Sequence, residues 1–288
     1  MPAATDSALA RYGAGTALLA TLAALLGALV GVVNPAGGAD PRPVVAALVC
    51  AVVAMLVPPL VALIWAPRRA AAAGGALAGF GAVSAVLLVS DVELLRRPID
   101  ANRFEVLRPV SAAELAVAPG AYLVLFGHVL GVLAGVLGAL ALQRASIRDG
   151  YGGSVEPELS GRSVALRAGP WWAVPTAATA LVLVAASIAA PWRVHDAVLL
   201  VRPLVESGGL AIAAAAVLGV VLLAGVAVAL ATPEAWTSAG LLIGLGATGF
   251  AVIGTRVAAG VDEGLTPTVT AWLAALSCVA LIAAGAVV

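Results

Sequence analysis

The chain has 288 residues, of which 62% are hydrophobic and only 10% are charged, and its mean hydropathy is +1.11. Soluble domains carry about 25% charged residues, so this composition excludes a soluble globular protein and predicts a polytopic membrane protein. The fifteen basic residues, all arginine, balance fifteen acidic residues. This neutral balance gives no indication of a nucleic-acid partner, and the lipid bilayer is the expected partner.

Eight apolar runs along the chain are each long enough to cross a bilayer. About 20 apolar helical residues span the hydrocarbon core. The runs are continuous rather than alternating, which favours helices over barrel strands. They cover residues 14–33, 44–65, 70–90, 115–142, 172–191, 208–231, 237–257 and 267–287. The expected fold is therefore an all-α, polytopic transmembrane helical bundle with eight spans.

The ends of these runs carry the signals expected at a membrane surface. Tryptophan prefers the headgroup level, and all six tryptophans fall at or near run ends: Trp65, Trp171, Trp172, Trp192, Trp236 and Trp272. An even number of spans places both termini on one side. The Arg68-Arg69 pair in a short turn favours the cytoplasmic side for both, in a plasma-membrane protein.

A glycine-rich motif occurs twice, as GALAGFGA at residues 75–82 and as GLLIGLGA at residues 240–247. The copies lie in the third and seventh runs, four spans apart. This spacing favours two tandem halves, residues 1–142 and 171–288, joined by the polar linker 143–170. Such parallel repeats are related by an axis along the membrane normal, and the third and seventh spans are expected to meet near it.

Glycine pairs four residues apart recur in the runs. Such pairs let two helix backbones approach closely, so the expected role is helix packing, with a ligand path as the alternative. The signal is weak, since several such pairs arise by chance in so glycine-rich a chain. The candidate packing residues are Gly75, Gly79, Gly127, Gly131, Gly135, Gly240 and Gly244.

His128 is the one ionisable residue well inside an expected span. An ionisable side chain at such a depth is a candidate functional group, because burying it is costly. No second histidine or carboxylate lies centrally in the runs, and no histidine stands one turn away to share a metal or haem. We therefore expect His128 to bond to a neighbouring helix, with proton coupling or ligand binding as the alternative.

Asp91 and Arg256 stand at the same offset from the two glycine motifs, at the far ends of the third and seventh spans. If the halves are related by a twofold axis, these opposite charges would approach each other at the outer surface. We state this ion pair as a hypothesis. The alternative is that each charge is a solvated group at a helix end.

Pro58-Pro59 and Glu114 are the remaining candidates. The two prolines remove two helical hydrogen bonds and are expected to kink or break the second span. Broken helices line sites in transporters, but the sixth span has no matching pair. Glu114 follows Ser111 at capping-box spacing, which favours a helix cap over an acid–base role.

No motif for phosphate binding, zinc hydrolysis or a nucleophilic serine occurs in the chain, so no catalytic residue, cofactor or metal is expected. The favoured function is a non-catalytic accessory or scaffold subunit of a bacterial cell-envelope or membrane complex. Its partners would be other membrane proteins or further copies of itself. The first alternative is a small-solute or lipid transporter or channel with a cavity between the halves, and the second is a lipid-modifying membrane enzyme. A cavity that reaches His128 would favour transport, and a packed centre would favour the scaffold.

Overall fold

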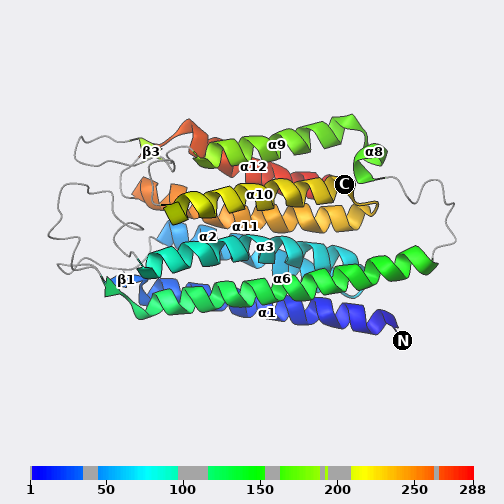
Figure 1. Ribbon diagram of the computed structural model, residues 1–288, viewed down its shortest axis with the longest axis horizontal. Coiled ribbons are helices and arrows are strands. Elements are labelled where there is room, and N and C mark those ends of the chain that lie inside the picture. The colour runs from blue at the N-terminus through cyan, green and yellow to red at the C-terminus, as the bar shows by residue number, and fades with distance from the viewer. Residues whose placement is uncertain are drawn as a thin grey trace.

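The computed structural model describes residues 2–34, 45–96, 116–152, 163–188, 192–193, 209–262 and 266–288. Within these residues, eight helices are long and apolar enough to cross a membrane, which confirms the expected all-α transmembrane fold. The helices run side by side along the long axis of the molecule, and both termini lie at the same end (Figure 1).

The spanning helices are α1 (Pro2–Val30), α2 (Val45–Trp65), α3 (Ala70–Arg96), α6 (Pro119–Gly152), α9 (Pro170–Ile188), α10 (Gly209–Ala231), α11 (Ala235–Asp262) and α12 (Val269–Val287). The short helix α8 (Val164–Ala168) precedes α9, and its Val164 N–H donates to the Thr232 carbonyl after α10. The segment expected as a linker, 143–170, therefore contains the end of α6 and all of α8.

Several helices extend further than the apolar runs that predict them, α1 and α3 among them. α1 begins at Pro2 rather than near residue 14, and α3 continues past Asp91 to Arg96. Hydropathy marks only the part of a helix that lies in lipid, whereas the alanine-rich segment before residue 14 has high helix propensity despite its charges. Asp91 is therefore a residue of α3 itself, within the span Ala70–Val92.

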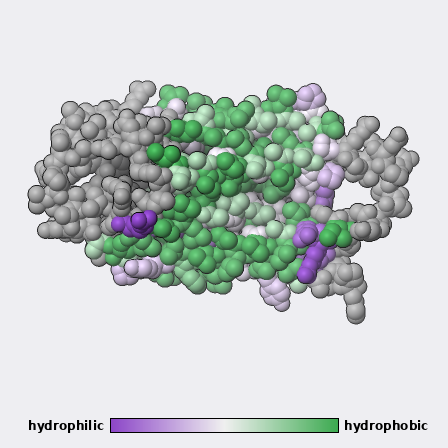
Figure 2. Space-filling view, viewed as in Figure 1, coloured by the Kyte–Doolittle hydropathy of each residue, from purple (hydrophilic) through white to green (hydrophobic). Residues whose placement is uncertain are grey.

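The outer surface of the bundle is apolar. Leu26, Val53, Leu133 and Val220 all expose between 46% and 66% of their surface. Figure 2 shows a hydrophobic band across the middle of the molecule, with hydrophilic residues toward both ends. So large a contiguous apolar surface is incompatible with water and fits the hydrocarbon core of a bilayer.

The four N-terminal and the four C-terminal spanning helices have the same pattern of neighbours. In the first group α6 packs against α1 and α3, and in the second α12 packs against α9 and α11. β1 (Val33–Asn34), after α1, pairs antiparallel with β2 (Ala116–Val117), before α6. In the same way β3 (Trp192–Arg193), after α9, pairs with β4 (Thr266–Pro267), before α12.

α3 and α11 form the centre of the bundle and pack closely against each other. They are the most buried spans: 67% of the most apolar stretch of α3 and 83% of that of α11 are buried, against at most 39% in the other six. Each also packs against a helix of the other group, α3 against α10 and α11 against α2. The two groups are therefore joined through one continuous interior.

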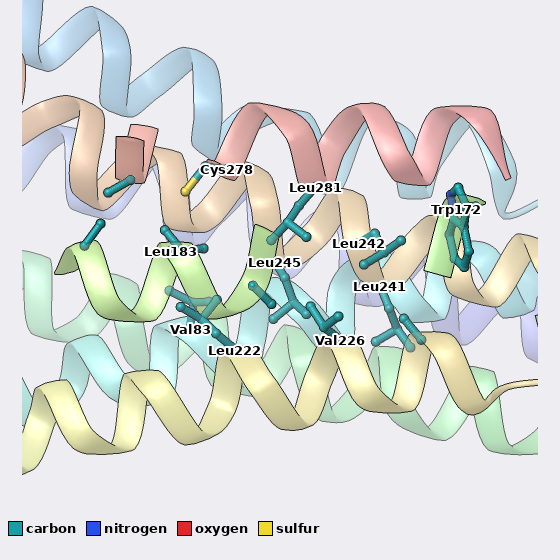
Figure 3. Packing of buried hydrophobic residues seen from close by; sticks show 14 of the residues in the cluster. Val83, Trp172, Leu183, Leu222, Val226, Leu241, Leu242, Leu245, Cys278 and Leu281 are labelled. Carbon is teal, nitrogen blue, oxygen red and sulfur yellow. The ribbon is translucent and has the colours of Figure 1, made fainter. Parts of the chain in front are cut away.

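The two groups fill their interiors with side chains of different size. Between α9, α10, α11 and α12 the buried cluster contains Leu183, Leu222, Leu245 and Leu281, which point toward one another (Figure 3). The cluster of α1, α2, α3 and α6 consists mainly of alanines. Small side chains let backbones approach closely, so α1 and α6 pack through glycine and alanine where the C-terminal group packs through leucine.

Candidate functional site

A buried contact between a carboxylate and an imidazole lies at the interface of α3 and α6. The Oδ2 atom of Asp91 is 2.6 Å from the Nδ1 atom of His128. Both side chains are only 10% exposed, and both residues lie within spanning segments. His128 is thus bonded to a neighbouring helix, and its partner is an ionisable group.

Glycine packing sets the register that brings the two residues together. A Cβ atom added to Gly135 would fall within 2.6 Å of the Gly81 Cα atom, and one at Gly131 would overlap the Ser84 side chain. The antiparallel helices α3 and α6 therefore touch backbone to backbone at these levels. Asp91 lies two turns further along α3, and His128 lies within one turn of the position that faces it.

Two of the protonation states that this geometry permits keep Asp91 ionised. In one, a neutral imidazole donates its Nδ1–H to the carboxylate, which leaves Nε2 as an acceptor. In the other, both imidazole nitrogens carry protons and the contact is an ion pair. Either state satisfies a carboxylate that would be costly to leave unpaired in a membrane. Within the described residues no group of three or more histidine, cysteine, aspartate or glutamate side chains is placed to hold a metal ion.

Arg256 and Glu114 are the other two charged candidates. The side chain of Arg256 and the whole of Glu114 fall outside the described residues. The hypothesis of an Asp91–Arg256 ion pair and the helix cap at Glu114 therefore stay predictions. Asp91, for its part, has a partner in His128.

The glycine motifs lie where α3 and α11 cross. A Cβ atom added to Gly79 would be 2.8 Å from the Leu245 amide nitrogen, and one at Gly75 would be 2.9 Å from the Thr237 carbonyl oxygen. On the other side, added Cβ atoms at Gly240 and Gly244 would overlap the α3 backbone at Ala72 and Ala76. Only glycine permits so close an approach.

The remaining candidate glycines lie on α6 and serve two different neighbours. Gly131 and Gly135 face α3, as described above. Gly127 faces α1, where an added Cβ atom would be 2.9 Å from the Ala20 carbonyl oxygen. α6 therefore packs closely on two sides, which fixes the position of His128 between α1 and α3.

α2 continues without interruption through Pro58 and Pro59, and both prolines are buried. Pro59 has no N–H to give to the Met55 carbonyl one turn earlier. The Thr21 hydroxyl on α1 lies 3.4 Å from this carbonyl oxygen. It also lies 3.0 Å from the carbonyl oxygen of Ala17, one turn earlier in α1. The single hydroxyl hydrogen of Thr21 is thus shared, with the shorter contact to Ala17 on its own helix and a longer one to the α2 carbonyl that proline leaves without its helical donor.

A pocket that neither Asp91 nor His128 lines lies in the half of the bundle that contains the β-strands. This space, here called the α10 cavity, has a volume of about 160 Å³. Its walls are residues of α3, α9, α10, α11 and α12, all apolar except for two serines: Val86, Leu87, Ser90, Val184, Ala186, Ser187, Ile188, Ala214, Ala215, Leu218, Gly219, Leu222, Val252, Ile253, Val257, Ala271 and Ala274. A second space of about 60 Å³ lies between α1 and α2. His128 lines neither of them.

Sequence reasoning found His128 and Asp91 as separate candidates and missed their contact and the α10 cavity. The signal for the contact was available in the glycines of α3 and α6, which fix the antiparallel register. No sequence signal marks the cavity, because alanine, valine and leucine line it as they line every other span.

These features define a class: the chain is an integral, multi-pass membrane protein, and its described residues contain eight helices that can span a membrane. Comparison with protein-family models, curated proteins and solved structures finds no match to the chain.

Proposed function

We propose that this protein is a non-catalytic accessory or scaffold subunit of a membrane complex, built from two similar four-helix halves. The observation that carries the proposal is the packed centre. α3 and α11 meet backbone to backbone at Gly75, Gly79, Gly240 and Gly244. Such packing fills the position where a path between the halves would run.

The proposed duplication is supported by position rather than by side-chain identity. Each half has a strand after its first helix that pairs with a strand before its fourth helix. The glycine motif lies in the third helix of each half, and these two helices contact each other. The charged pair belongs to one half only, since α12 carries the buried Cys278 at the level where α6 carries His128.

A structural role also fits the placement of polar groups. Within the described residues, the one buried polar side-chain atom without a hydrogen-bond partner is the Ser238 hydroxyl. The Asp91 carboxylate already has a partner in His128. A lipid-modifying enzyme would need Asp91 to converge with Glu114, Arg97 or Arg108, which lie outside the described residues.

The test is the composition of the purified complex. The full chain is extracted from its native membrane in mild detergent and weighed by native mass spectrometry. A second membrane protein in fixed stoichiometry supports the proposal. Recovery of the chain alone, together with solute flux into vesicles that contain it, contradicts the proposal and favours transport.

The expected cytoplasmic position of both termini is tested separately, by protease access to terminal tags on intact cells.

Transport of a small apolar solute or a lipid is the second candidate, and the α10 cavity is the observation that favours it. The cavity opens among helices of both halves, since α3 contributes Val86, Leu87 and Ser90. It does not reach His128, so proton coupling through that residue has no support from its walls.

A further inference from the structure

The α10 cavity has a chemical character that restricts what it can hold. Among the described residues no charged side chain lines it, and its polar groups are the hydroxyls of Ser90 and Ser187. An ion or a strongly polar solute would lose its hydration there without compensation. Apolar cavities of about 150 Å³ stay dry and accept hydrocarbon groups of the size of benzene.

The position of the cavity favours a ligand that is already in the bilayer. Its wall on α10 runs from Ala214 to Leu222, about 12 Å at 1.5 Å per residue, and this stretch lies inside the span Ile212–Ala231. An unfilled space of this size forfeits dispersion contacts along its whole lining. Hydrocarbon tails surround the helix at high concentration, so mass action favours their entry.

The two serines lie at the end of the cavity nearest the β-strands. Ser90 is exposed, and within the described part of the chain its hydroxyl has no hydrogen-bond partner. The Ser187 hydroxyl donates to the Leu183 carbonyl oxygen at 2.7 Å and so keeps acceptor capacity. Polar groups at one end and the buried Leu222 at the other match an amphiphile better than a purely apolar solute.

The smaller space between α1 and α2 provides an internal comparison. Its described lining comes from α1 and α2 alone, and it has only about 60 Å³. Thr21 and Met55 line it, and the Thr21 hydroxyl lies 3.4 Å from the Met55 carbonyl oxygen. Of these two spaces, only the α10 cavity combines residues of both groups of helices.

We propose that the α10 cavity binds part of one hydrocarbon tail of a membrane lipid, with the lipid's ester region near Ser90 and Ser187. Its volume accepts a segment of a tail rather than a whole chain. This proposal does not depend on the scaffold function, because either a scaffold or a transporter can hold a bound lipid.

Photolabelling tests the proposal. The full chain is reconstituted in nanodiscs with a phosphatidylcholine that carries a diazirine on one acyl chain, and adducts are mapped by peptide mass spectrometry. The expected result is labelling of Leu222 and Ile253, which line the cavity, besides the outward-facing Val220. Adducts confined to outward-facing residues would overturn the proposal.

Neighbouring alanines on α10 supply a matched pair of variants. Ala215 lines the cavity, whereas Ala216 is exposed on the outer surface. Ala215→Leu should reduce labelling of Leu222 and Ile253 by at least about fivefold, because overfilling costs about 1 kcal/mol or more. Ala216→Leu should leave this labelling unchanged. Equal labelling in both variants contradicts a bound tail.

Leu222→Ala keeps the proposal testable if Ala215→Leu fails to fold. This variant widens the cavity floor and should raise labelling of Ile253 relative to Val220. No increase would contradict the proposal. Absence of cavity labelling combined with a rise in thermal midpoint on addition of benzene would also overturn it, since the occupant would then be a small apolar solute.

Discussion

The Asp91 carboxylate of α3 lies 2.6 Å from His128 Nδ1 of α6, inside the membrane-spanning part of the bundle. The pair joins two antiparallel helices that also approach each other closely at glycines. It is a polar contact in an interface of Gly81, Gly131 and Gly135. Its strength should therefore be measurable against an apolar background.

Removing either partner should destabilise the protein strongly. Asp91→Asn and His128→Gln each leave a buried group with a lost or weakened partner, and breaking a buried pair in this way costs about 3–5 kcal/mol. The free energy of unfolding, measured by denaturant titration in detergent micelles, checks this. Arg96→Gln on the exposed end of the same helix should change it by less than about 0.5 kcal/mol.

The double variant separates the contact from the individual residues. Asp91→Asn/His128→Gln should cost less than the sum of the single changes, with a coupling energy of about 0.5–3 kcal/mol. Strict additivity would show that the two side chains do not interact, and would contradict the geometry.

Glycine at position 79 should be essential for the contact between α3 and α11. Gly79→Ala places a methyl group 2.8 Å from the Leu245 nitrogen and 3.0 Å from the Leu241 carbonyl oxygen. Backbone atoms cannot move aside easily, so the expected loss of unfolding free energy is about 1–3 kcal/mol. Gly15→Ala is the matched control, because nothing lies within 4 Å of its added methyl group. It should be neutral or stabilise α1 by up to about 1 kcal/mol.

The Thr21 hydroxyl on α1 should stabilise the fold because Pro59 on α2 leaves the Met55 carbonyl without its helical donor. Thr21→Val removes the donor that approaches the Met55 carbonyl, and a lost hydrogen bond of this kind costs about 1 kcal/mol. Pro59→Ala restores the missing backbone N–H on α2, so the same Thr21→Val change should cost less in that background. Equal costs in both backgrounds would contradict the link between Thr21 and Pro59.

A cluster at the membrane surface contains Arg69, Trp65 at the end of α2 and Trp236 at the start of α11. The Arg69 guanidinium lies 2.9 Å from the Trp236 ring centre, and the rings of Trp65 and Trp236 meet edge to face at 5.8 Å. Arg69→Gln should cost about 0.5–1 kcal/mol and shift the tryptophan emission. The neighbouring change Arg68→Gln should do neither, and an identical spectral shift in both variants would count against the contact.

The number and position of the spans could be predicted from the sequence because hydrocarbon imposes length and helicity on every apolar run. The helix ends could not, as α1 and α3 show. Outside lipid, alanine-rich or charged residues continue a helix without any change in hydropathy that marks its end. For that reason Asp91 was expected at the far end of the third span, whereas it lies within α3 and bonds to His128.

Pairing between helices was partly accessible from the sequence. The repeated glycine motif indicates that the third and seventh spans meet, since only glycine allows backbone contact. The α10 cavity was inaccessible, because the small residues that line it on α10, such as Ala214, Ala215 and Gly219, are of the same types that occur throughout the spans. Packing defects of this kind depend on the relative placement of five helices and leave no pattern in any one of them.

The packed centre is tested most directly by thiol accessibility at Thr248. This residue is fully buried on α11, one turn beyond Gly244, and its hydroxyl bonds to the Gly244 carbonyl. Thr248→Cys is prepared in a background in which Cys50 and Cys278 are replaced, with Val261→Cys as the exposed control. A charged methanethiosulfonate reagent, added to either side of a reconstituted membrane, should modify the cysteine at 261 and leave that at 248 unmodified. Rapid modification at 248 would reveal an aqueous path between the halves and contradict the packed centre.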